Sequence, residues 1–251
     1  MRIRTHHGVL AAGLAAAAFV VPAVAQQDAD LPATRIVSSA RATPNTAGTP
    51  AHPQGMKITA SARLIAPADV EAPIVTGVEI LTVKGITWTH GKYAKCAKAT
   101  LDRRGPAGCP RVSIMGSARA SGNADTVATH VDLTFVNGGP GTTYLYARLD
   151  NPARVRETLV LKTAPLSGGG PWGQREEVSI PRSLQIVGGV PLQLTSLKMT
   201  VGGKSYAKEF IANTSCPRGG WRYQVTAHYL YESLGGRTTD DVTTGSIPCT
   251  R

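Results

Sequence analysis

Residues 126–149 read TVATHVDLTFVNGGPGTTYLYARL, and they carry the clearest structural signal of the chain. Apolar and polar residues alternate over 126–136 and again over 144–149, with a Gly- and Pro-rich turn at 137–141 between them. Alternation with a period of two is typical of a strand that buries one face. The stretch therefore predicts an antiparallel hairpin.

Similar runs rich in Val, Ile and Thr recur on both sides of this hairpin, and no run of about 11 residues shows a helical period. The phase of the alternation shifts near Thr195, which predicts a β-bulge there. Roughly ten strands at a spacing of about 8–12 residues predict an all-β fold, an antiparallel β-sandwich. The other strand candidates are residues 57–65, 74–89, 112–120, 156–163, 177–186, 192–201, 205–212, 221–231 and 237–247.

Composition divides the chain into three parts. Residues 1–25 combine a basic start, a short apolar run and the small residues Ala23-Val-Ala25, which is the pattern of a secretory signal peptide. Residues 26–55 are rich in Pro, Thr and Ala and contain few bulky apolar residues, so we expect a disordered leader that is dispensable for folding. Residues 56–251 are then a single β-sandwich domain, with no transmembrane segment in the mature chain.

All four cysteines, Cys96, Cys109, Cys216 and Cys249, lie in the part expected to be exported. An even number of cysteines in such a chain indicates two disulfides. Four cysteines allow three pairings. Proximity along the chain favours Cys96–Cys109 and Cys216–Cys249, although the sequence cannot exclude the other two. A zinc site is not favoured, because closely spaced C-x2-4-C pairs are missing.

Two short segments follow Cys109 and Cys216. The first reads Cys109-Pro-Arg-Val-Ser-Ile-Met-Gly116, and the second reads Cys216-Pro-Arg-Gly-Gly-Trp221 before a tyrosine-rich run. In these segments the chain resembles exported actinobacterial β-rich proteins of uncharacterised function. The likeness extends loosely over residues 56–251. It implies export and a β-rich fold, and it implies no activity, cofactor or site.

Candidate catalytic residues are few. His130 and Asp132 lie two positions apart, so they share one face of a predicted strand, and Ser113 is the serine nearest to a recognisable motif. These three residues could form a secreted hydrolase with an unfamiliar site. However, the chain has no Gly-x-Ser-x-Gly segment and no His-Glu-x-x-His segment. We therefore expect no catalytic residue, no metal site and no cofactor, and we keep the hydrolase as the alternative.

A pair of carboxylates and a set of tyrosines can each be explained without a functional site. The neighbouring carboxylates Glu176 and Glu177 would point to opposite faces of a strand, so we expect solvated turn or edge residues rather than an acid–base pair. Tyr223, Tyr229 and Tyr231 would share a face, either as core or as a platform for sugars. The scarcity of aromatic residues favours the core.

The chain is basic, with 27 Lys and Arg against 16 Asp and Glu. Removal of Arg2 and Arg4 with the signal leaves a net charge of about +9, and the cations are scattered along the sequence. No nucleic-acid motif is present. We therefore expect a non-enzymatic protein, secreted or held at the cell envelope, with a binding or structural role. Its possible partners are anionic cell-envelope polymers.

Overall fold

The computed structural model describes residues 31–68 and 70–251. The predicted signal peptide, residues 1–25, lies outside the described residues, as do residues 26–30 of the predicted leader. Within the described part, the residues from Pro32 to Arg251 form one unit.

The elements of this unit are mostly long antiparallel strands. The strands are β1 (Arg35–Thr43), β2 (Gln54–Ile65), β3 (Ile74–Val83), β4 (Ile86–Trp88), β5 (Ile114–Ala124), β6 (Val127–Gly139), β7 (Thr142–Leu149), β8 (Val155–Pro165), β9 (Trp172–Ser179), β10 (Ile186–Val187), β11 (Val190–Val201), β12 (Ile211–Asn213), β13 (Trp221–Tyr231) and β14 (Arg237–Ile247). The helices are α1 (Lys98–Arg104) and α2 (Arg182–Gln185), with short 3-10 turns η1 (His90–Lys92), η2 (Pro106–Gly108) and η3 (Arg111–Ser113).

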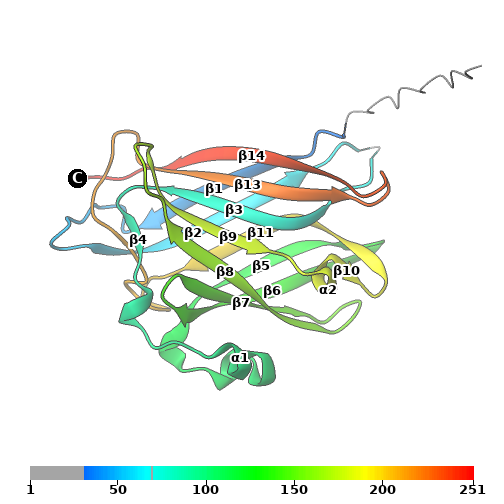
Figure 1. Ribbon diagram of the computed structural model, residues 1–251, viewed down its shortest axis with the longest axis horizontal. Helices are drawn as coiled ribbons and strands as arrows, with labels where there is room; N and C mark the ends of the chain where they lie inside the picture. The colour runs from blue at the N-terminus through cyan, green and yellow to red at the C-terminus, as the bar shows by residue number, and fades with distance from the viewer. Residues whose placement is uncertain (1–30, 69) are drawn as a thin grey trace, which may run out of the picture. The chain divides into compact units, whose positions relative to one another are not determined.

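All the described strands belong to one 14-stranded sheet, in the order β14-β13-β3-β9-β8-β7-β6-β5-β11-β2-β12-β4. Strand β1 pairs with β2 beside this path, and β10 pairs with β11. The sheet folds over on itself, so that β14, β13 and β3 lie across from β5, β6 and β7 (Figure 1). Because each strand alternates, one face of the sheet is turned inward and the other outward.

The inward face forms the hydrophobic core. Phe135 of β6 and Leu145 of β7 belong to the same buried cluster as Trp221 and Tyr223 of β13. The predicted hairpin is confirmed, because β6 and β7 pair with Phe135 opposite Leu145. The predicted bulge is confirmed as well, at the register shift beside Thr195. The all-β antiparallel fold class is confirmed, with fourteen strands in the described part instead of about ten.

The prediction of a disordered leader is wrong for the described part of residues 26–55. Strand β1 pairs with β2 over its whole length, from Arg35 opposite Ile65 to Thr43 opposite Lys57. The residues that follow β1 are also bound to the domain, since the N–H of Ala47 donates to the carbonyl of Thr250 at 2.8 Å. The small side chains of this segment fit because the backbone ladder, rather than apolar bulk, holds them.

Both predicted disulfides are confirmed. Cys96 is bonded to Cys109, with 5.4 Å between their Cα atoms, and Cys216 is bonded to Cys249, with 5.8 Å. The first disulfide closes the loop that contains α1. Leu101 of α1 is fully buried, and it packs with Cys96 and Val136 in a small cluster on the outward side of β6 and β7. The cysteine loop is thus fixed to the sheet as a wall beside the outward face.

Candidate functional site

The three residues of the hydrolase alternative do not meet. Ser113 is fully buried in η3, where its Oγ donates to the carbonyl oxygen of Pro110 at 2.6 Å. His130 lies on β6 opposite Ser121 of β5. Ser113 immediately precedes β5, so it is separated from the level of His130 by most of that strand, roughly 25 Å at about 3.3 Å per residue. His130 is therefore too far away to act as the base for the Ser113 hydroxyl.

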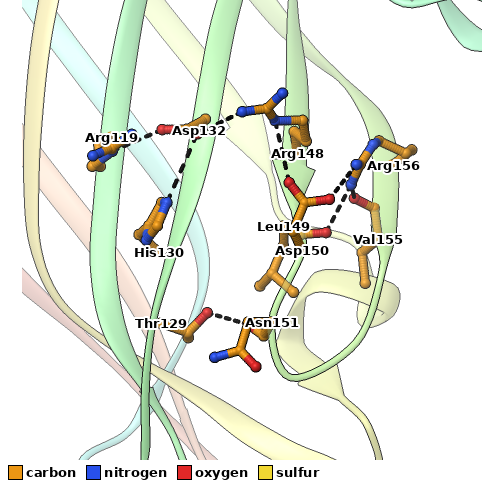
Figure 2. Close-up of polar contacts among 10 residues, drawn as sticks. All are labelled: Arg119, Thr129, His130, Asp132, Arg148, Leu149, Asp150, Asn151, Val155 and Arg156. Carbon is orange, nitrogen blue, oxygen red and sulfur yellow. Dashed lines mark hydrogen bonds and ion pairs between the residues drawn. The ribbon is translucent and has the colours of Figure 1, made fainter.

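Asp132 is held by two arginines, as Figure 2 shows. The Nε of Arg119 donates to one carboxylate oxygen at 2.8 Å, and a terminal nitrogen of Arg148 donates to the other at 3.2 Å. The Nε2 of His130 is 3.9 Å from the same carboxylate. The hydrogen bond from Arg119 is the largest cause that lowers the pKa of Asp132. The carboxylate therefore stays ionised as a counter-ion and is a poor general base.

A second set of contacts holds the neighbouring strands. Arg156 of β8 donates to the carbonyl of Leu149 at 2.7 Å and also bonds the carboxylate of Asp150, while Thr129 of β6 donates to the carbonyl of Asn151 (Figure 2). These bonds tie β6, β7 and β8 together. The arginines of this corner are consequently held in place rather than free to move with solvent.

The register of the sheet places these charges in one row on the outward face. Each residue of the row is the Cα partner of the next, from one strand to its neighbour. We call this the basic row, and it consists of Ser61 (β2), Lys198 (β11), Arg119 (β5), Asp132 (β6), Arg148 (β7) and Arg156 (β8). Neighbouring strands are about 4.8 Å apart, so the cations follow one another at intervals that a charged polymer can match.

A parallel row of hydroxyl groups lies beside the basic row. Its members are Thr59 (β2), Thr200 (β11), Ser117 (β5), Thr134 (β6) and Tyr146 (β7), again joined by the register. The whole hydroxyl row and the middle of the basic row, from Lys198 to Arg148, line a surface groove of about 580 Å³, and Pro106 from the cysteine loop forms part of its wall. Hydroxyl groups can donate to the oxygens of a phosphate, sulfate or sugar, and the cations supply charge.

Beyond the groove, the outward face carries basic residues and no acidic ones over four adjacent strands. Strands β1, β2, β11 and β5 lie side by side and contain no Asp or Glu among them. Their basic residues all have the outward parity of the alternation, since the inward positions carry small or apolar side chains. We call this the basic face, and it consists of Arg35, Arg41, Lys57, Arg63, Arg119 and Lys198.

The basic face is largely unneutralised. Among the described residues, an ion pair is found for Arg119 alone of the six, with Asp132. Lys198 and Arg63 are exposed and have no ion pair in the described part of the chain. The cations that are scattered along the sequence are therefore brought together on one face of the sheet. The sequence does contain a signal for this face. Within each strand, the cations fall only on every second position, which is the set of positions that points outward.

Two other predictions are settled by burial. Tyr223, Tyr229 and Tyr231 are all buried, so the core interpretation is confirmed and the sugar platform is not. Glu176 is not a solvated residue, which corrects the prediction: it is 1% exposed on the inward face of β9, whereas Glu177 faces outward beside Arg175. The alternation that separates the two carboxylates also turns one of them into the core.

Among the described residues, no group of three or more His, Cys, Asp or Glu side chains is placed to hold a metal ion. In the same part of the chain, no helix combines the length and the apolar character needed to cross a bilayer. Comparisons of the chain with protein-family models, with curated proteins and with solved structures found no match.

Proposed function

We propose that this chain is an exported, non-enzymatic β-sandwich protein whose basic face binds an anionic polymer of the cell envelope. The observation that supports the proposal best is the composition of four adjacent strands, β1, β2, β11 and β5. They present six cations and no acid on one face of the sheet. A uniform sign of charge over a rigid surface attracts a polyanion and concentrates it there.

The cations have fixed positions along the sheet, and such a fixed array suits a polymer that contacts several of them at once. The cations are carried by paired strands rather than by loops, so little order has to be gained on binding. Arg119 and Arg148 are held in place by their bonds to Asp132. Planar guanidinium groups suit phosphate and carboxylate oxygens, and the neighbouring hydroxyl row offers further donors.

Export rests on separate observations. Residues 1–25 have the pattern of a signal peptide, and two disulfides are typical of proteins in oxidising compartments. The hydrolase alternative, with Ser113, His130 and Asp132, has less support because the serine is buried and far from the histidine.

The test is retention of the purified mature protein on immobilised inorganic polyphosphate, with neutral dextran as the reference matrix. The double variant Lys198→Gln, Arg63→Gln should bind at least about tenfold more weakly, because each cation near an anionic surface contributes roughly 1 kcal/mol. The matched control, Lys208→Gln with Arg218→Gln, removes the same charge from exposed positions outside the basic face.

Equal weakening in the two double variants would show that net charge alone decides binding, and the basic face would then have no special role. Retention that persists in molar salt would also contradict the proposal. Exposed charges are screened over about 8–10 Å at physiological ionic strength, so electrostatic binding must weaken as salt is added.

A further inference from the structure

The interior of the folded sheet contains a cavity of about 280 Å³. Its cause is visible in the register: Ala40 of β1, Ala60 of β2 and Met199 of β11 are successive partners, and Ala118 of β5 continues the row. All four residues line the cavity. Three of these four side chains on neighbouring strands are alanines, and such small side chains leave space that protein cores normally fill.

The partial exposure of inward residues supports the same conclusion. Ala60, Ile80 and Val225 point into the folded sheet and line the cavity, yet none of them is fully buried. An apolar space of this kind binds apolar molecules: an engineered cavity of roughly 150 Å³ lined by apolar side chains stays dry and accepts benzene. The present cavity is larger, and it is still smaller than a typical drug site.

One wall of the cavity carries a buried carboxyl group. Glu176 of β9 is 1% exposed and lines the cavity, and one of its oxygens accepts a hydrogen bond from the indole N–H of Trp88 at 2.5 Å. Its other oxygen, Oε2, is buried and has no hydrogen-bond partner among the described residues. An unpaired polar atom in an apolar interior is unfavourable, so a ligand that pairs with it gains affinity.

The surroundings of Glu176 are also polar and unpaired. The hydroxyl of Thr82, on β3, lines the cavity and has no partner in the described part of the chain. Thr163, the register partner of Glu176 on β8, and the side-chain oxygen of Gln174 also have no hydrogen-bond partner in the described part, although these two residues do not line the cavity. A threonine hydroxyl can donate as well as accept. The cavity wall therefore offers a donor, the hydroxyl of Thr82, together with the acceptor oxygen of Glu176.

We propose that the cavity binds a small aliphatic molecule with a terminal hydroxyl group, the hydroxyl donating to Glu176 and the chain lying among the inward alanines. A hydroxyl group is neutral and can also accept a hydrogen bond from Thr82. Beside the ionised form of Glu176, a fatty-acid carboxylate would place two like charges together. An ammonium group would have to leave water for an apolar interior, which is costly. This site is independent of the basic face, which lies on the opposite side of the sheet.

The experiment is calorimetric titration of the mature protein at pH 8 with two probes of equal size, 1-octanol and heptyl methyl ether. Burial raises the pKa of Glu176 to about 7, so the carboxyl group is mostly ionised at pH 8 and cannot donate to the ether. Only the alcohol then has a donor for the free oxygen of Glu176. The wild type should bind the alcohol saturably and about tenfold more tightly than the ether. The Glu176→Leu variant should bind the two probes about equally. The matched control Glu177→Gln changes the adjacent outward carboxylate and should keep the preference.

A second variant tests whether the ligand lies in the cavity. Ala60→Leu fills part of the cavity and should abolish binding of both probes, while Asn123→Leu enlarges an exposed outward residue and should leave binding unchanged. Circular dichroism checks that each variant folds. Failure of the wild type to bind octanol, equal wild-type affinity for the two probes, or full binding by folded Ala60→Leu would each overturn the proposal. The two wild-type tests hold even if a variant does not fold.

Discussion

The backbone N–H of Ile36 donates a hydrogen bond of 2.6 Å to the carboxylate of Asp241, although 205 positions separate the two residues in the chain. Ile36 belongs to β1, which pairs with β2 beside the sheet path, and Asp241 belongs to β14, the strand at one end of that path. Close by, the hydroxyls of Thr34 and Tyr231 are 2.7 Å apart. Both contacts use side chains, and no backbone ladder pairs β1 with β14 among the described residues.

The first prediction concerns this contact between β1 and β14, which we call the seam. Asp241→Ala removes the acceptor and leaves the N–H of Ile36 unpaired, so it should lower the free energy of unfolding by about 1–3 kcal/mol. Urea denaturation measures the loss. The neighbouring variant Asp240→Ala is the control. Asp240 pairs with His228 at an exposed position, and such pairs contribute only about 0–1 kcal/mol. Equal effects of the two variants would contradict the role of the seam.

The second prediction reverses the expectation that the leader is dispensable. Deletion of residues 26–43 removes β1, exposes the edge of β2 and uncovers the inward face beside it. The buried side chain of Ile36 alone contributes about 1.5–3 kcal/mol. The melting temperature should therefore fall by at least about 5 °C for a domain of this size. Removal of residues 26–30 only, which precede the described part, is the control and should leave the temperature within about 2 °C.

The strands that could be predicted from the sequence are those that bury bulky side chains on one face. The hairpin of residues 126–149 is such a case, because Val131, Leu133 and Phe135 recur with a period of two. Strand β1 could not be recognised in this way, since its inward positions are Ile36, Ser38, Ala40 and Ala42. What makes it a strand is its pairing with β2 and its contact with β14, and neither is encoded locally.

The third prediction follows from Glu176. Burial raises the pKa of its carboxyl group from 4.5 to about 7, while the hydrogen bond from Trp88 lowers it to a smaller extent. The folded protein thus binds a proton that the unfolded chain releases between pH 4.5 and 7. Stability must fall as the pH rises through that window. Between pH 5 and pH 8 the expected loss from this group is about 2–3 kcal/mol.

Urea denaturation at pH 5 and at pH 8 measures this loss. Glu176→Gln should remove it, because the amide does not titrate, whereas Glu177→Gln should keep it. His90 contributes with the opposite sign, since burial lowers its pKa, but this contribution is common to all variants. The comparison of the two glutamine variants therefore isolates Glu176. The same pH dependence in both would mean that the carboxyl group is not held in the apolar interior.

The candidate site shows a different limit of sequence reasoning. Arg63 and Lys198 are 135 positions apart in the chain, yet they lie on adjacent strands because β2 and β11 pair. The strand order β5-β11-β2-β1 joins segments from both halves of the chain, and no local pattern reveals it. Parity alone could have indicated which cations face outward, and it could have assigned Glu176 to the inward face with Val178.

The last prediction concerns Asp132, the carboxylate within the basic row. Asp132→Asn removes its charge and frees Arg119 and Arg148 to meet an anionic ligand, while the amide oxygen can still accept a hydrogen bond. The stability cost should be small, about 1 kcal/mol, because both arginines are more than half exposed and such pairs contribute little. Retention on polyphosphate should shift to higher salt, opposite in direction to the effect of Lys198→Gln. Glu177→Gln on β9 adds the same net charge on a strand that does not adjoin β1, β2, β11 or β5, and it serves as the control. If the two variants elute together, the row does not bind the polymer, and the binding surface has to be sought on another part of the molecule.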